Sequence, residues 1–216
     1  MTHTLHREGD RESLENDYVV LTMPAAGHNY ENSGPAVRAF LDLAEQYGAV
    51  DVNVGTDTAS VWQEDFEMLY DGIEDGDMGH AVFPNFDDLE DFLTDYAEMD
   101  MGLSTVVSGL FDKTQEVCEN VSERVDDGAH PEPHTTRKWF GVYGNRDRLA
   151  EAPVREVSTM CGHAMVSFSL IREMRDAVAE GRLDSRTAAE RLAEPCVCGV
   201  FNTDRAQTLL ERMAEE

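Results

Sequence analysis

The chain has 216 residues, 44 of them acidic and 17 basic, so its formal net charge is −27. This length suffices for a substantial core, and a hydrophobic content of 41% excludes a disordered polyelectrolyte. Nucleic-acid binding is not expected, because no basic stripe is present to replace phosphate counterions.

The acidic residues are spread along the whole chain. This distribution is typical of halophilic proteins, because concentrated salt shortens the Debye length to about 3 Å and screens self-repulsion. The alternative is an acidic mimic of nucleic acid or a docking surface for a basic partner. We expect a solvated halophilic surface.

No apolar run approaches the roughly 20 residues that span a bilayer. The first sixteen residues are polar and lack the apolar core of a signal peptide. We therefore expect a cytoplasmic protein that does not bind membranes. In a reducing cytosol, clustered cysteines are metal ligands or redox groups more often than structural disulfides.

Residues 1–16 predict a flexible acidic arm, and a first β-α-β unit follows it. Residues 17–25 are rich in β-branched side chains and predict a buried strand. Residues 35–48 predict a helix, with a proline in its first turn and a glycine at its end. Residues 49–56 alternate apolar and polar side chains and predict a second strand.

A second cycle follows, with strands predicted at 78–85 and 102–109 and helices at 86–99 and 110–125. These elements make an α/β domain over residues 17–128, with an α+β fold as the alternative. The order of elements fits a ferredoxin-like arrangement, and an open parallel sheet with crossover helices fits nearly as well.

Residues 129–216 form either a separate segment or a continuation of the same domain. Strands are predicted at 135–144 and 155–160, and helices at about 165–179, 185–193 and 203–214. The sequence thus predicts a layered sheet followed by a C-terminal helical segment.

Two short turns in this segment carry the residues that point most clearly to chemistry. One contains Cys161 and His163, the other Cys196 and Cys198, and each pair is separated by a single residue. Thiolates with an imidazole suit zinc or an iron–sulfur cluster, and four ligands complete a tetrahedral shell. A hairpin of the two helices between the turns would bring them together. We therefore predict a Cys₃His site that holds Zn²⁺ or an iron–sulfur cluster.

Two other interpretations of these residues stay open. The thiols could form a catalytic redox pair, because a C-x-C disulfide closes a strained and reducible ring. They could also be buried free cysteines beside a helix-capping histidine. Cys118 differs from the others, since its helical spacing with apolar residues predicts core packing.

The remaining candidates concern substrate binding and catalysis. His28 follows the first strand, and His130 and His134 flank a Pro-rich loop, so His28 and His134 are candidate catalytic groups. A cationic stretch between 137 and 155 could bind a small anionic substrate or pair with acidic helices. Its members are Arg137, Lys138, Arg146, Arg148 and Arg155.

The sequence thus predicts a metalloprotein with redox or Lewis-acid chemistry on a small anionic molecule. The alternative is a non-catalytic, zinc-stapled module that binds a protein partner or serves a metalloenzyme.

Overall fold

The computed structural model describes residues 7–55, 66–126 and 143–215. Within them, four strands form one sheet in the order β2-β3-β1-β4, and each neighbouring pair is antiparallel. The strands are β1 (Tyr18–Met23), β2 (Asp51–Gly55), β3 (Met78–Phe83) and β4 (Ser104–Ser108). Each lies inside a predicted range, so these four predictions are confirmed.

Two interleaved β-α-β units connect the strands. Helix α2 (Ser33–Gln46) joins β1 to β2, which run parallel with β3 between them. Helix α4 (Phe86–Glu98) joins β3 to β4, which run parallel with β1 between them. This is the ferredoxin-like arrangement. The open parallel alternative is wrong, because every neighbouring pair of strands is antiparallel.

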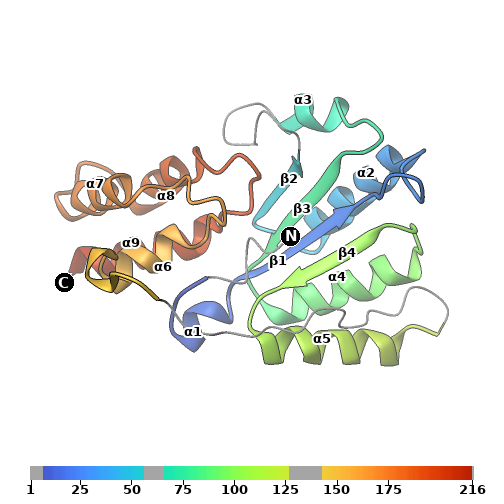
Figure 1. Cartoon of the computed structure of the whole chain (residues 1–216), viewed down its shortest axis with the longest axis horizontal. Helices are drawn as coiled ribbons and strands as arrows, with labels where there is room; N and C mark the ends of the chain where they lie inside the picture. The colour runs from blue at the N-terminus through green and yellow to red at the C-terminus, as the bar shows by residue number, and fades with distance from the viewer. Residues whose placement is uncertain (1–6, 56–65, 127–142, 216) are drawn as a thin grey trace.

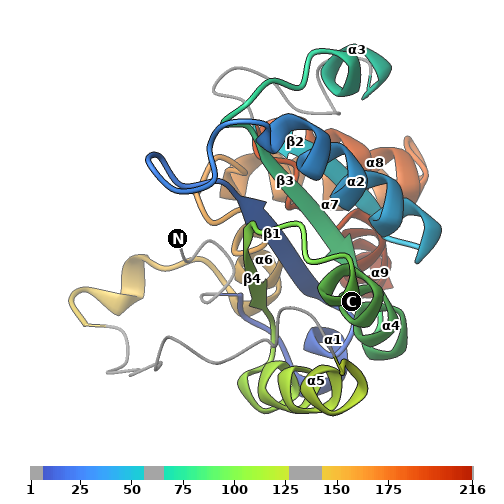
Figure 2. The ribbon, with the colours of Figure 1, turned by 90° about the vertical axis from the view of Figure 1, so that its right-hand side faces the viewer.

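The sheet has an apolar core on each face. Tyr18 and Val20 of β1 belong to the core formed with α2, α4 and α5 (Phe111–Arg124). Val19 and Leu21 point the opposite way, as alternation along a strand requires, and join the core of the C-terminal helices. Figures 1 and 2 show these helices gathered apart from α2, α4 and α5. The sheet therefore contributes side chains to both cores.

The C-terminal segment consists of short helices. They are η1 (Arg146–Arg148), α6 (Ala152–Ser158), α7 (Phe168–Ala179), α8 (Ser185–Ala193) and α9 (Thr203–Glu215). The predictions for α7, α8 and α9 are confirmed. The predicted strand at 155–160 is wrong, because this stretch lies mostly in α6. Pro153 occupies the first turn of α6, and Val154 and Val157 are buried at helical spacing.

Several other predictions concern the ends of the chain and the stretches outside the described residues. Residues 7–16, the described part of the expected arm, include helix α1 (Arg11–Leu14) and contact the C-terminal segment. The predicted strand at 135–144 lies outside the described residues except for its last two, which have no regular structure. Helix α3 (Phe66–Asp71) was not predicted. None of the helices in the described part of the chain is long and apolar enough to cross a bilayer.

Candidate metal centre

The two cysteine-containing turns have the same backbone design. The first cysteine turn (residues 161–164) links α6 to α7, and the second cysteine turn (residues 196–199) links α8 to α9. In each, the backbone N–H of the fourth residue donates to the carbonyl of the first cysteine, at 3.0 Å. The fourth residues, Ala164 and Gly199, both have a left-handed backbone, with φ of 55° and 66°. Cys161 thus corresponds to Cys196, and His163 corresponds to Cys198.

The fold brings the four predicted side chains together. The Sγ atoms of Cys196 and Cys198 lie 3.9 Å apart, and the Nδ1 atom of His163 lies 3.7 Å from Sγ of Cys198. Cys161 is within side-chain hydrogen-bonding reach of Cys196. The three cysteines are buried and His163 is exposed, so the group reaches the surface on its imidazole side. The close approach that the helix hairpin predicts is therefore observed.

Hydrogen bonding divides the three thiols into two types. The neighbouring Cys196 thiol, followed by backbone N–H groups of residues 163, 165 and 166, lowers the pKa of Cys161 to about 5. Cys196 and the backbone N–H of Val200 likewise lower the pKa of Cys198 to about 6, with a further contribution from His163. Hydrogen bonds to both neighbours raise the pKa of Cys196. Hydrogen bonding therefore favours the thiolate form of Cys161 and Cys198 and the thiol form of Cys196.

Apart from the Cys196 thiol, backbone N–H groups in and directly after the turns stabilise the thiolates, rather than the N-termini of the following helices. The N-cap of α7 is Ser167, six positions after Cys161, and the influence of a helix dipole is confined to its first turn. The N–H donors instead lie at position 163, inside the first cysteine turn, and at positions 165, 166 and 200, directly after the two turns.

The four side chains form a chain of neighbouring pairs. Among the residues that the structure describes, no set of three or more His, Cys, Asp or Glu side chains converges as a finished metal site. The contacts run from Cys161 to Cys196, then to Cys198 and to His163. Closing a shell from this chain of contacts requires rotation of side chains.

None of the substrate-binding and catalytic candidates in the described part of the chain is hydrogen-bonded to the thiols. His28 is exposed in the loop after β1. Arg146 and Arg148 are exposed in η1, whereas Arg155 donates from Nε to Glu8 at 2.9 Å. The other candidates lie outside the described residues, namely His130, His134, Arg137 and Lys138. The anion-binding prediction therefore stays a prediction.

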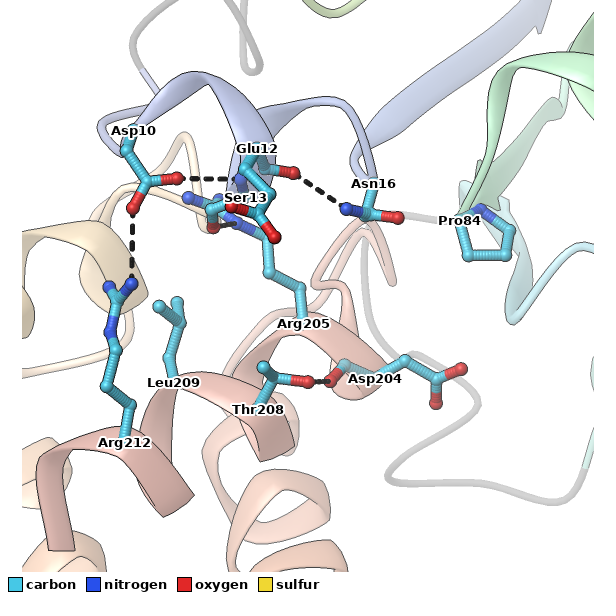
Figure 3. A pocket seen from close by; sticks show the side chains of 10 residues that line it. All are labelled: Asp10, Glu12, Ser13, Asn16, Pro84, Asp204, Arg205, Thr208, Leu209 and Arg212. Carbon is cyan, nitrogen blue, oxygen red and sulfur yellow. Dashed lines mark hydrogen bonds and ion pairs between the residues drawn. The ribbon is translucent and has the colours of Figure 1, made fainter. Parts of the chain in front are cut away.

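A cavity of about 350 Å³ lies between α1 and α9 (Figure 3). No residue of either cysteine turn lines it. The two arginines that line it are ion-paired. Arg205 binds Asp17 at 2.8 Å, and Arg212 binds Asp10 at 3.2 Å. With Asp10, Glu12 and Asp204 also in its wall, this cavity is not suited to an anion.

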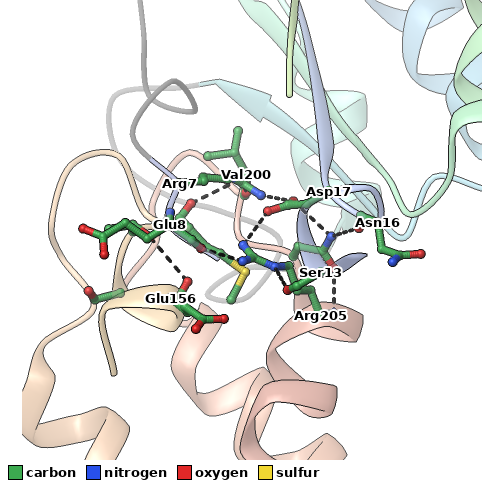
Figure 4. Close-up of polar contacts among 12 residues, drawn as sticks. Arg7, Glu8, Ser13, Asn16, Asp17, Glu156, Val200 and Arg205 are labelled. Atoms are coloured by element: carbon green, nitrogen blue, oxygen red, sulfur yellow. Dashed lines mark hydrogen bonds and ion pairs between the residues drawn. The ribbon is translucent and has the colours of Figure 1, made fainter. Parts of the chain in front are cut away.

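Sequence reasoning missed a buried ionic cluster beside the cysteine turns (Figure 4). It comprises Arg7, Asp17 and Arg205, whose side chains are 4%, 0% and 2% exposed. Arg7 and Asp17 belong to a polar N-terminal stretch, which is typical of a solvent-exposed surface. The one signal of burial in its sequence is that its cations are arginines, the residue type preferred in buried ion pairs.

Comparison of the chain with protein-family models, with curated proteins and with solved structures finds no match.

Proposed function

We propose that this chain is a zinc protein in which Cys161, His163, Cys196 and Cys198 hold one tetrahedral ion. The observation that carries the proposal is the pair of matching turns with their ligand atoms in contact. Tetrahedral zinc with Zn–S bonds of about 2.3 Å places two sulfurs about 3.8 Å apart, and a sulfur and an imidazole nitrogen about 3.6 Å apart. The observed separations of 3.9 and 3.7 Å are close to these values.

The same distances favour a mononuclear site over a [4Fe–4S] cluster. In a [4Fe–4S] cluster each cysteine binds a different iron, so the sulfur atoms of the ligands are spread around the cluster. Here the two sulfurs of the C-x-C pair are in direct contact. A single cation also suits the group, because the hydrogen bonds that lower the pKa of Cys161 and Cys198 favour the thiolate form that binds metals.

We assign the ion a structural role, as a staple between the two turns. The first cysteine turn leads into α7 and the second into α9, so one ion would fasten two helix starts at once. A closed shell of four protein ligands is typical of structural zinc, whereas catalytic zinc keeps an open position. Redox or Lewis-acid chemistry on an anionic molecule is the competing proposal. The arginines beside the described thiols, Arg7 and Arg205, are already paired with Asp17, so they are not available for such an anion.

Two further parts of the proposal follow from composition and thiol chemistry. Thiolate ligation requires reduced cysteines, which favours the cytoplasm. The spread of carboxylates favours a concentrated-salt environment. The proposed partner is a protein that contacts the folded surface, rather than a nucleic acid or a membrane.

The decisive experiment is anaerobic purification in high salt, followed by a visible spectrum and elemental analysis of the same sample. We expect a colourless protein with one zinc per chain. Stoichiometric iron with labile sulfide would replace zinc by a cluster. Neither metal, in a sample shown to be folded by circular dichroism, would contradict the proposal.

A pair of cysteine variants tests the role of the ion. Cys198→Ser should lose zinc and unfold at lower temperature, because the fourth ligand of the staple is absent. Cys118→Ser, on α5 and part of the opposite core, should keep zinc and serve as the matched control. A Cys198→Ser protein with unchanged stability but lost catalytic activity would favour the catalytic proposal.

A further inference from the structure

The buried guanidinium of Arg7 connects the two cysteine turns. Its Nη2 atom donates to the backbone carbonyl of Met160, at 3.2 Å, and to the carbonyl of Val200. Met160 directly precedes Cys161. Val200 follows the second cysteine turn, and its backbone N–H is hydrogen-bonded to Cys198. One side chain therefore holds the backbone at the edge of both turns.

Arg7 itself is held in place by a buried carboxylate. Asp17 accepts hydrogen bonds from Arg7 and, at 2.8 Å, from Nη1 of Arg205. Asn202 also donates to Asp17, at 3.1 Å. Burial acts to raise the pKa of Asp17, but the two guanidiniums and these hydrogen bonds hold it below its ordinary value. The carboxylate is therefore charged and fixes the orientation of Arg7 (Figure 4).

The two arginines contact different parts of the molecule. Arg205 donates to Ser13 at 2.9 Å and to the carbonyl of Glu8 at 2.7 Å, both in the N-terminal stretch. Arg7 donates to the backbone beside the cysteine turns. Arg205 thus anchors the N-terminal stretch, and Arg7 extends from that stretch to the turns.

We propose that Arg7 is a positioning residue for the thiol site, which sets the separation of the two cysteine turns and supplies a buried counter-charge. The inference rests on the proposed zinc site. Three thiolates, a neutral imidazole and one Zn²⁺ together carry one negative charge. Two guanidiniums and one carboxylate leave one positive charge in the ionic cluster. Opposite charges of this kind reduce the penalty for burying a charged site.

Arg7→Gln is the variant that tests the proposal, with Arg205→Gln as its matched control. Both substitutions remove one guanidinium from Asp17, but only the first removes the bonds to Met160 and Val200. We expect Arg7→Gln to weaken zinc binding about 10- to 100-fold and to shift the visible spectrum of the Co²⁺-substituted protein. Arg205→Gln should lower the melting temperature and leave that spectrum unchanged.

A conservative variant separates charge from geometry. Arg7→Lys keeps the positive charge but lacks the planar fork that reaches Asp17 and both carbonyls. It should restore part of the zinc affinity, and its Co²⁺ spectrum should stay shifted. The proposal is overturned if folded Arg7→Gln binds zinc as tightly as the wild type and has the same Co²⁺ spectrum. It is also overturned if Arg205→Gln shifts that spectrum as much as Arg7→Gln does.

A metal-free measurement separates this inference from the zinc proposal. In a Cys198→Ser background, oxidation by diamide should join Cys161 to Cys196, with the two thiols losing two electrons and two protons to the diamide. Adding Arg7→Gln should slow this cross-link severalfold, because the turns are then free to separate. If the wild-type chain binds no metal and Arg7→Gln still slows the cross-link, the zinc proposal fails and the positioning role stands. An unchanged rate of cross-linking overturns the positioning role.

Discussion

Gly199 packs directly against Asn53 at the junction between the second cysteine turn and the sheet. An ideal Cβ atom at position 199 would lie 2.5 Å from Cβ of Asn53, and the glycine has a φ of +66°. Asn53 belongs to β2 and pairs with His80 of β3. This contact places the candidate metal centre against the sheet, so the position of the thiols depends on the fold as a whole.

Replacing Gly199 should therefore destabilise the protein more than replacing a comparable glycine elsewhere. Gly181 has a nearly identical φ of +67°, but no atom lies within 4 Å of its ideal Cβ position. Gly181→Ala should cost about 1 to 2 kcal/mol for the left-handed backbone. Gly199→Ala should cost about 2 to 5 kcal/mol, because overpacking against Asn53 is added. Denaturant unfolding of both variants measures the difference, and equal losses would show that the contact is easily relaxed.

A pH dependence is expected from the buried carboxyl of Asp51. It accepts a hydrogen bond from the backbone N–H of Thr203, at 3.2 Å, at the start of α9. Burial raises its pKa well above the ordinary value of 3.8. Its contribution to stability is then complete below that value and is lost as the pH rises through the folded pKa. The stability of the wild type minus that of Asp51→Asn should therefore fall as the pH rises from the ordinary value of 3.8 through the folded pKa.

Asp75 provides a control of opposite sign. Backbone N–H groups of Gly34 and Asn32 lower its pKa, so its contribution is present above the ordinary value and lost as the pH falls. The stability of the wild type minus that of Asp75→Asn should not fall over the same interval of rising pH. Urea titrations at constant salt give both differences. If the stability difference for Asp51→Asn does not change with pH, the pKa of this buried carboxyl is not raised.

The exposed imidazole of His163 should matter for metal binding and little for folding in the metal-free state. His163→Ala should reduce zinc affinity at least about tenfold. Loss of a residue that only hydrogen-bonds to a ligand already lowers metal affinity by about that factor, and loss of the ligand itself should lower it further. His28→Ala alters an equally exposed histidine in the loop after β1 and should leave zinc affinity unchanged. Competition with a chromophoric chelator measures both affinities. Equal affinities in the two variants would remove His163 from the ligand set.

The acidic surface predicts that stability increases with salt. Raising KCl from about 0.1 M to about 3 M should increase the melting temperature progressively, because shorter Debye lengths screen the repulsion of 27 excess negative charges. A matched series in sucrose separates screening from the general effect of excluded solutes. A melting temperature that does not depend on KCl would contradict the halophilic interpretation.

The sequence alone determined the local elements and the residues of the candidate site. Short apolar runs placed β1, β3 and β4, and alternation of apolar and polar residues placed β2. The apolar period near 3.6 placed α2 and α4, because this period arises from the geometry of a single helix. Two pairs of metal-ligating residue types, each separated by a single residue, also singled out Cys161, His163, Cys196 and Cys198. The exception was α6. Its few apolar residues fit a strand as well as a helix, and Pro153 in the first turn favours the helix.

Only the tertiary structure decided the order of the strands, the backbone conformation of the two cysteine turns and the role of the N-terminal stretch. Strand order depends on pairing between residues far apart in sequence, and both parallel and antiparallel sheets were compatible with the same pattern. The left-handed backbone of Ala164 leaves no mark in composition, because alanine rarely adopts it. Arg7 in a polar stretch resembles a surface residue until Asp17, Met160 and Val200 are brought around it. Burial of that charge is a property of the assembled fold, since only long-range contacts replace the water that a guanidinium loses.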